Sequence, residues 1–216
     1  MATYLDESLA KLEWFEGSIP WMYLDTRGNV TVGVGLMVAD AAAACRLPFL
    51  AGSRPATESE ITAEFDRVHA MPMGRPAVFY RGQGALELEK PEIDALLRTV
   101  VLGFEGELRA KLTGYDGFPD SVKVALLDMA YNLGPLRLIN EYPTLIAAVE
   151  ARNWARAASN SFRHGPGAAR NQWTRKMFQQ NVIDTVSASG DGGVKRFAYG
   201  LVGIGAAAVD WFRGDR

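Results

Sequence analysis

The sequence predicts an α+β, mainly helical protein with a small β-hairpin or three-stranded sheet near its N-terminus. Two observations support this fold class. Apolar residues recur at helical spacing over most of the chain beyond residue 90, whereas residues 22–35 alternate with a period of two. The composition, 48% hydrophobic and 22% charged, is that of a globular chain with a sizeable core and excludes a disordered or fibrous protein.

Residues 4–16 are predicted to form an amphipathic helix because three leucines follow one stripe at helical spacing. Glu16 takes the next position on that stripe, and Gly17 follows where helices commonly end on glycine. We therefore expect a carboxyl group at the last turn of this helix, directed toward buried or cleft-facing surroundings.

Residues 22–35 are predicted to form two strands joined by the turn DTRGN. In the second strand three valines point one way, and Thr31 points the other way with two glycines. Because the chain reverses here, we expect Glu16 and Asp25 to lie near each other.

The middle of the chain is less regular, with a short helix and loop over 38–58 and a helix over 58–69. The stretch 77–80 is expected to form a small strand or a lid. Beyond it we expect helices over 91–112, over 120–133 with Asp120 as N-cap, over 144–158 and over 168–182.

Two parts of the chain are expected. Residues 1–183 are expected to form the main domain, and residues 184–216 are expected to form a tail that begins with a linker over 184–196. The apolar segment 197–212 is shorter than a membrane span and is interpreted as a last helix on the domain, or as a segment that docks on a partner or a membrane surface.

Several classes of function are disfavoured. A net charge of -2 gives no general attraction for nucleic acid, and the acid-bearing N-terminus does not resemble a signal peptide. With one cysteine, Cys45, and two histidines, the chain is a poor candidate for a metal site or a histidine-based triad. We expect no cofactor and no metal, and chemistry that depends on carboxylates.

Glu16 and Asp25 are expected to differ in protonation. A partly buried position and the negative end of the helix dipole favour a protonated Glu16, as a general acid requires. Asp25, in a polar turn, is expected to be ionised, and Thr31 is placed to hold a water against it. Two acids in contrasting environments indicate glycoside hydrolysis. Alternatively, Asp25 and Thr31 are ordinary turn and strand residues.

The order of these residues is similar to a known family. The motifs stand as Glu16-Gly17, then Tyr23-Leu24-Asp25, then GNVTVGVG over 28–35. They resemble the motifs of the phage-type lysozymes, over residues 5–182 and weakly over 38–88. The run ALLDMAYNLGP resembles the family's central buried helix. This resemblance implies a two-lobed fold, with a small lobe over 14–70 and a helical lobe over 88–183 that includes the N-terminal helix.

The resemblance also implies a muramidase that cleaves the β-1,4 bond between N-acetylmuramic acid and N-acetylglucosamine. Glu16 would protonate the leaving oxygen, and Asp25 with Thr31 would activate water, with inversion at the anomeric carbon. The sugar contacts it implies are Met37, Tyr131, Thr144 and Asn160. Departures from the family pattern are Leu36, where many relatives have histidine, and extra residues around 70–86.

The expected partner is the glycan strand of peptidoglycan. Made in the cytoplasm, the enzyme would reach the cell wall as a phage endolysin through holin lesions, or as an effector delivered by a secretion system and opposed by an immunity protein. The slightly acidic charge favours the effector. Two other functions stay open: a catalytically silent module that binds glycan or a partner, and a chitinase-like hydrolase.

Overall fold

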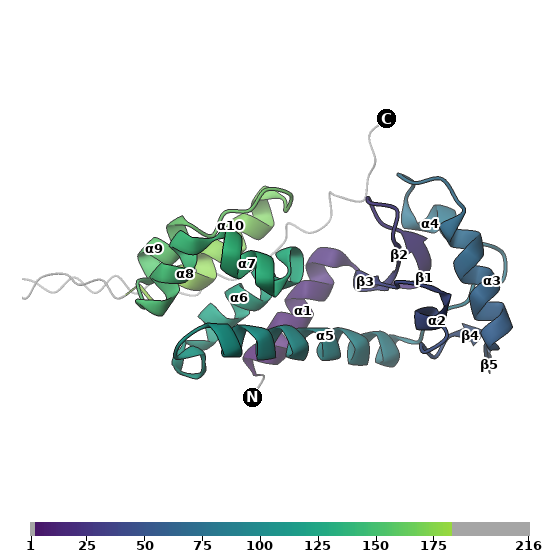
Figure 1. The fold of residues 1–216 in the computed structure, drawn as a ribbon, viewed down its shortest axis with the longest axis horizontal. Helices are drawn as coiled ribbons and strands as arrows, with labels where there is room; N and C mark the ends of the chain where they lie inside the picture. Colours follow the sequence, from purple (N-terminus) through teal and green to yellow (C-terminus); the bar gives the residue numbers. More distant parts are fainter. Residues whose placement is uncertain (1–2, 183–216) are drawn as a thin grey trace, which may run out of the picture. The chain divides into compact units, whose positions relative to one another are not determined.

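A computed structural model describes residues 3–182. These residues form a mainly helical protein with a small antiparallel sheet, which confirms the expected fold class (Figure 1). The first helix, α1 (Tyr4–Glu16), begins at a capping box between Thr3 and Asp6. It ends at Gly17, whose φ of 76° is unfavourable for a residue with a side chain. The predicted helix and its stop signal are thus confirmed.

The sheet holds β1 (Ile19–Leu24), β2 (Val30–Gly33) and β3 (Leu36–Met37), in that order. All neighbours are antiparallel, and β2 is the central strand. Every residue of β2 is buried, so both of its faces are covered. Thr31, predicted to point away from the valines, is therefore buried as well.

After the sheet come α2 (Ala41–Ala44), a ribbon of β4 (Leu50–Ala51) and β5 (Arg54–Pro55), and α3 (Glu58–His69). The ribbon was not predicted, because two-residue strands leave no readable alternation. Figure 1 shows α3 beside the three-stranded sheet, and α3 packs against both β1 and β2.

The segment predicted as a small strand or a lid is one helical turn, α4 (Ala77–Tyr80). It packs on β1, where the indole Nε1 of Trp21 donates to the carbonyl of Ala77 at 2.9 Å. Trp21 forms an isolated antiparallel β-bridge with Glu87, which occupies the edge of β1 where a further strand would have had to pair. Residues 77–80 therefore satisfy their backbone hydrogen-bonding groups by forming a local helical turn.

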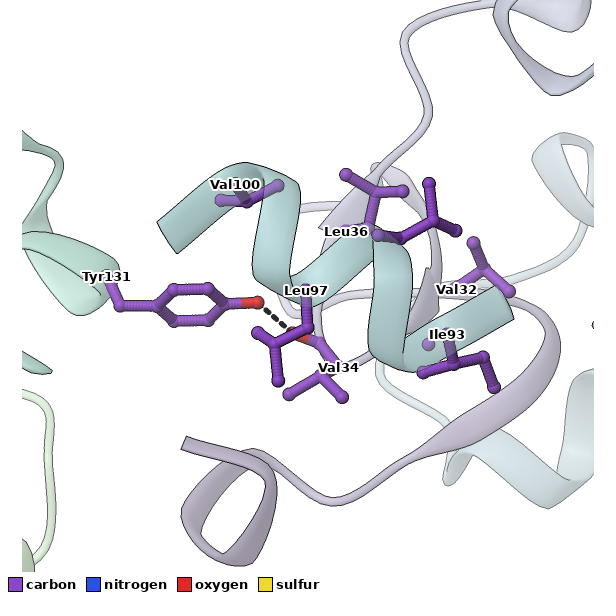
Figure 2. A pocket seen from close by; sticks show the side chains of 9 residues that line it. Val32, Val34, Leu36, Ile93, Leu97, Val100 and Tyr131 are labelled. Atoms are coloured by element: carbon purple, nitrogen blue, oxygen red, sulfur yellow. Dashed lines mark hydrogen bonds between the residues drawn. The ribbon is translucent and has the colours of Figure 1, made fainter. Parts of the chain in front are cut away.

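The longest helix, α5 (Lys90–Lys111), confirms the helix predicted over 91–112 and spans about 33 Å at 1.5 Å per residue. Its first half packs on the sheet through Ile93, Leu97 and Val100 (Figure 2). Its second half contacts the 3-10 turn η1 (Tyr115–Gly117), and Glu105 accepts a hydrogen bond from Tyr4 of α1. One helix therefore joins the sheet to the other helices.

The remaining helices are α6 (Asp120–Leu133), α7 (Pro135–Glu141), α8 (Pro143–Glu150), α9 (Trp154–Ser159) and α10 (Ala168–Gln179). The prediction of one helix over 144–158 was wrong. Arg152, with a φ of 54°, interrupts the predicted helix. The Asn153 side chain then caps α9 by accepting a hydrogen bond from the backbone N–H of Arg156. Asp120 is not the N-cap, because Pro119 holds that position and Asp120 is the first helical residue.

Helix α6 lies at the centre of the helical core. Residues 122–130 are all buried, and the helix packs against α1, α5, α7 and α10 (Figure 1).

No helix within residues 3–182 is long and apolar enough to cross a membrane. The predicted linker and tail segment lie outside the described residues.

Tyr131 of α6 connects the helices to the sheet. Figure 2 shows its ring extending from α6 so that the hydroxyl donates to the carbonyl of Val34, between β2 and β3. Its ring also meets Phe104 of α5 edge-on, with centroids 6.1 Å apart. The apolar cavity beside it encloses only about 10 Å³, so it is a packing gap and not a ligand site.

Replacing Tyr131 with phenylalanine should lower the free energy of unfolding by about 1 kcal/mol, because the Val34 carbonyl loses its donor. Urea denaturation would measure the loss. Tyr142→Phe is the matched control, since the Tyr142 hydroxyl makes no hydrogen bond within the described residues. Equal losses in the two variants would contradict a connecting role for Tyr131.

Candidate functional site

The candidate site begins at Glu16, the last residue of α1. Its carboxylate pairs with Arg170 of α10, with 2.6 Å between Oε1 and Nη1, and its side chain is 29% exposed. We expected this carboxyl to face buried or cleft-facing surroundings, and its arginine partner was not predicted. Residues 154 positions apart meet here, so no local sequence pattern could have shown the pairing.

Arg170 belongs to a buried group of charges that sequence analysis missed. Its Nε donates to Asp128 at 2.8 Å, and Asp128 also pairs with the fully buried Arg163 at 2.6 Å. Burial opposes the charged form of Arg170, but Asp128 and Glu16 outweigh that effect and raise its pKa. We call Glu16, Asp128, Arg163, Arg170 and Thr174 the arginine cluster. The one feature of the sequence that indicated this cluster is an acid, Asp128, within the apolar run that forms α6.

Asp25 lies in the turn that joins β1 to β2. Its Oδ1 accepts the backbone N–H groups of Arg27 and Asn29, each at 2.8 Å, and its Oδ2 accepts the Asn29 amide at 3.0 Å. Desolvation is the largest single effect on the Asp25 pKa and raises it. The hydrogen bonds from Asn29, Arg27 and Gly28 together outweigh desolvation and lower the pKa. Asp25 is therefore an anion at neutral pH, as predicted.

The charges of both acids act on Tyr23. Its pKa is raised to about 12, first by desolvation and then by the negative charges of Glu16 and Asp25. The closeness of Glu16 and Asp25 that the chain reversal predicts stays a prediction.

A row of three side chains crosses the sheet beside these acids. Thr31 pairs with Tyr23 on one side and with Met37 on the other, and directly paired residues share one face of a sheet. The hydroxyl of Thr31 donates to the carbonyl of Asn29 at 3.0 Å, and the residue is only 3% exposed. Its lone pairs remain available to accept a hydrogen bond, so a water-holding role stays a prediction.

The four predicted sugar contacts occupy different places. Met37 is exposed and lines a hollow with Asn29 of the Asp25 turn and His69 of α3. Tyr131 is bound to the Val34 carbonyl, and burial and then the charges of Glu16 and Tyr23 raise its pKa. Thr144 is exposed in the first turn of α8.

Asn160 ends α9, and its amide donates back to the carbonyl of Arg156 at 2.8 Å. Met37 therefore shares a hollow with Asn29 of the Asp25 turn, and Tyr131 is affected by the charge of Glu16, whereas no hydrogen bond or ion pair within the described residues joins Thr144 or Asn160 to either acid.

The extra residues around 70–86 abut the turn that carries Asp25. A side chain at Gly28 would meet the sulfur of Met73, which shows that the Met73 side chain lies against this turn. Tyr80 anchors the segment, because it is buried and its hydroxyl donates to the carbonyl of Pro72 at 2.9 Å. The segment therefore supports the Asp25 turn from outside the sheet.

No group of three or more acids, histidines or cysteines within residues 3–182 is arranged to hold a metal ion. Compared with models of known protein families and with the curated proteins, the chain matches none.

Asp25→Asn should lower the free energy of unfolding at pH 7 by about 1 kcal/mol, because the turn loses a charged acceptor. The folded-state pKa of Asp25 is depressed, so this stabilisation exists above its unfolded value of about 3.9 and disappears as the pH falls through the folded value.

Urea denaturation of both proteins between pH 7 and pH 2 would measure the difference. Asp66→Asn, on an exposed face of α3, is the control and should differ little from wild type at any pH. A stability gap at Asp25 that persists at pH 2 would contradict the charged hydrogen bonds.

Proposed function

We propose that this protein is a peptidoglycan hydrolase that cleaves the β-1,4 bond between N-acetylmuramic acid and N-acetylglucosamine. The observation that carries the proposal is the pair of carboxyl groups in contrasting surroundings, whose charges both act on Tyr23: Glu16 against a guanidinium, and Asp25 in a turn rich in N–H donors. Two acids with different environments are what acid/base glycoside hydrolysis needs.

In the proposed reaction Glu16 donates a proton to the glycosidic oxygen as the bond breaks. Asp25 accepts a proton from the attacking water, which bonds to the anomeric carbon from the opposite face. Thr31 would accept a hydrogen bond from that water, since its own proton is directed to the Asn29 carbonyl. The charges balance, because one carboxyl loses a proton while the other gains one, and the anomeric centre inverts.

The proposal includes a two-lobed fold, with the substrate lying between the sheet and the helices α7 to α10. Helix α5 supports it, because its first half packs on the sheet and the helix also contacts α7. Met37 beside the Asp25 turn and Tyr131 beside Glu16 would contact the sugar rings from the two parts. Thr144 and Asn160 are proposed as contacts further along the glycan.

Glu16→Gln and Asp25→Asn should each reduce the release of reducing ends from purified peptidoglycan by a factor of about 10² to 10⁴, as expected for loss of a general acid or base. Glu13→Gln is the matched control. It lies one turn earlier in α1 and pairs only with the half-exposed Lys90 at 3.0 Å, so it should retain activity.

Circular dichroism and the urea midpoint would establish that each variant is folded. Wild-type protein that binds peptidoglycan but releases no reducing ends would contradict the enzyme and favour a silent binding module. Faster cleavage of chitin than of peptidoglycan would favour the chitinase-like alternative.

A further inference from the structure

Aromatic side chains from two helices meet on one exposed surface, where α1 contacts α10. Trp14 of α1 is 64% exposed. Its ring meets that of Phe15 edge to face, with 4.7 Å between the centroids. Phe15 meets Trp173 of α10 in the same way, at 5.4 Å. Three rings that are far apart in the sequence therefore form one continuous aromatic surface.

The ammonium group of Lys11 lies among these rings. Its Nζ is 4.6 Å from the ring centroid of Trp14 and 5.7 Å from those of Phe15 and Trp173. Such contacts are favourable because the negative face of an aromatic ring attracts a cation. Lys11 thus links the three rings, and most of the Trp14 indole stays open to solvent.

The lysines of this surface have no carboxylate partner. Lys11 forms no ion pair within residues 3–182, because three of the four acids of α1 pair with other basic residues and the fourth, Glu7, does not reach it. On α10, Lys176 is exposed, forms no ion pair in the described part of the chain, and follows Trp173 by one helical turn. Helix α10 itself contains no acid.

This surface therefore combines aromatic rings with uncompensated positive charge. We call it the aromatic platform, and it consists of Lys11, Trp14, Phe15, Trp173 and Lys176. Opposite charge is the general basis of electrostatic complementarity between binding partners, so a fitting ligand carries negative charge as well as a flat apolar face.

The composition of the aromatic platform favours a carbohydrate over a lipid or a protein surface. Trp14 is the only large apolar side chain exposed on α1 and α10, so these helices offer no broad apolar face to a membrane or to a protein interface. A pyranose ring is similar in size to an indole. It presents C–H groups on one face, and these groups pack favourably on the negative face of an aromatic ring.

The substrate of the proposed function has this chemistry. Peptidoglycan is a polymer of pyranose rings whose peptide stems carry carboxylates, so it offers both sugar faces and negative charge. The aromatic platform is also contiguous with the candidate site, because Trp14 and Phe15 directly precede Glu16 in the last turn of α1.

We propose that the aromatic platform is a second binding surface for the glycan strands of peptidoglycan. Trp14 stacks on a sugar ring, and Lys11 and Lys176 pair with carboxylates of the peptide stems. The surface holds the protein on its insoluble substrate between cleavage events. This proposal deepens the proposed function, on which it rests for the identity of the polymer.

The test is binding to insoluble peptidoglycan sacculi, measured by sedimentation over a range of protein concentrations. Every protein in the series carries Asp25→Asn, which removes the proposed base and leaves α1 and α10 unchanged. Trp14→Ala should then weaken binding about tenfold, as expected for the loss of an aromatic anchor. Because Trp14 is largely exposed, its removal opens no cavity, and circular dichroism would show that the variant is folded.

Two further substitutions at Trp14 separate ring stacking from general apolarity. Trp14→Tyr should keep most of the affinity, because tyrosine retains a flat ring. Trp14→Leu should lose as much affinity as Trp14→Ala. A leucine variant that binds sacculi as tightly as the parent protein would overturn stacking on a sugar.

The contribution of charge is tested with Lys11→Met. It should weaken binding about threefold at low salt and less at high salt, where charge interactions are screened. Leu102→Ala and Lys111→Met are the matched controls, since both residues are exposed on α5, and neither should change binding.

Several outcomes would overturn the proposal. Unchanged sacculus binding in Trp14→Ala is the first, and equal affinity for chitin, which has sugar rings without stem carboxylates, is the second. Binding to phosphatidylglycerol vesicles that depends on Trp14 would assign the aromatic platform to a membrane surface instead. A dimer that depends on Trp14 in sedimentation velocity would assign it to a second copy of the chain.

The binding assay separates this proposal from the proposed function. Release of reducing ends by the wild-type protein tests the enzyme, whereas sacculus binding by the Asp25→Asn proteins requires no cleavage. If the wild type releases no reducing ends, the proposed function fails, and the Trp14 series still decides whether the aromatic platform binds the glycan.

Discussion

The site depends on one interaction, the guanidinium of Arg170 held between Asp128 and Glu16. A buried arginine is costly unless its charge is balanced, and here two carboxylates from two different helices balance the charge of Arg170 and accept hydrogen bonds from two of its three nitrogens. The same contacts join α1, α6 and α10 at the end of α1 where Glu16 lies. Stability and the proposed chemistry therefore use the same charges, which makes the cluster sensitive to any change in their balance.

The sheet supplies the other half of the site by a different principle. Antiparallel pairing places Tyr23, Thr31 and Met37 side by side, and the turn between β1 and β2 holds Asp25 through backbone N–H groups. The position of Asp25 is thus set by local hydrogen bonds, and that of Glu16 by contacts between distant helices. This contrast explains how two carboxyl groups of similar intrinsic acidity can be given the opposite roles that we propose.

The sequence predicted the local features well. Helix α1 with its stop at Gly17, α5 and α6 follow from periodicity and end signals within a few residues. It gave no sign of the features that distant contacts decide: Thr31 is buried because both faces of β2 are covered, and the Arg170 partner of Glu16 comes from 154 positions away. The break at Arg152 was missed because an unfavourable φ in one residue leaves no pattern, although Asn153 is a typical cap. The acid within the apolar run of α6 was the one available sign of the cluster.

The anomeric configuration of the first product is the most direct test of the account. Proton NMR of wild-type protein with soluble peptidoglycan fragments, recorded before mutarotation, would show which anomer forms. We predict new reducing ends of N-acetylmuramic acid in the α configuration, inverted from the β-1,4 linkage, because Asp25 activates water and forms no bond to the sugar. Reducing ends that appear first as the β anomer would contradict this pairing of acid and base, and the absence of reducing ends would contradict the enzyme itself.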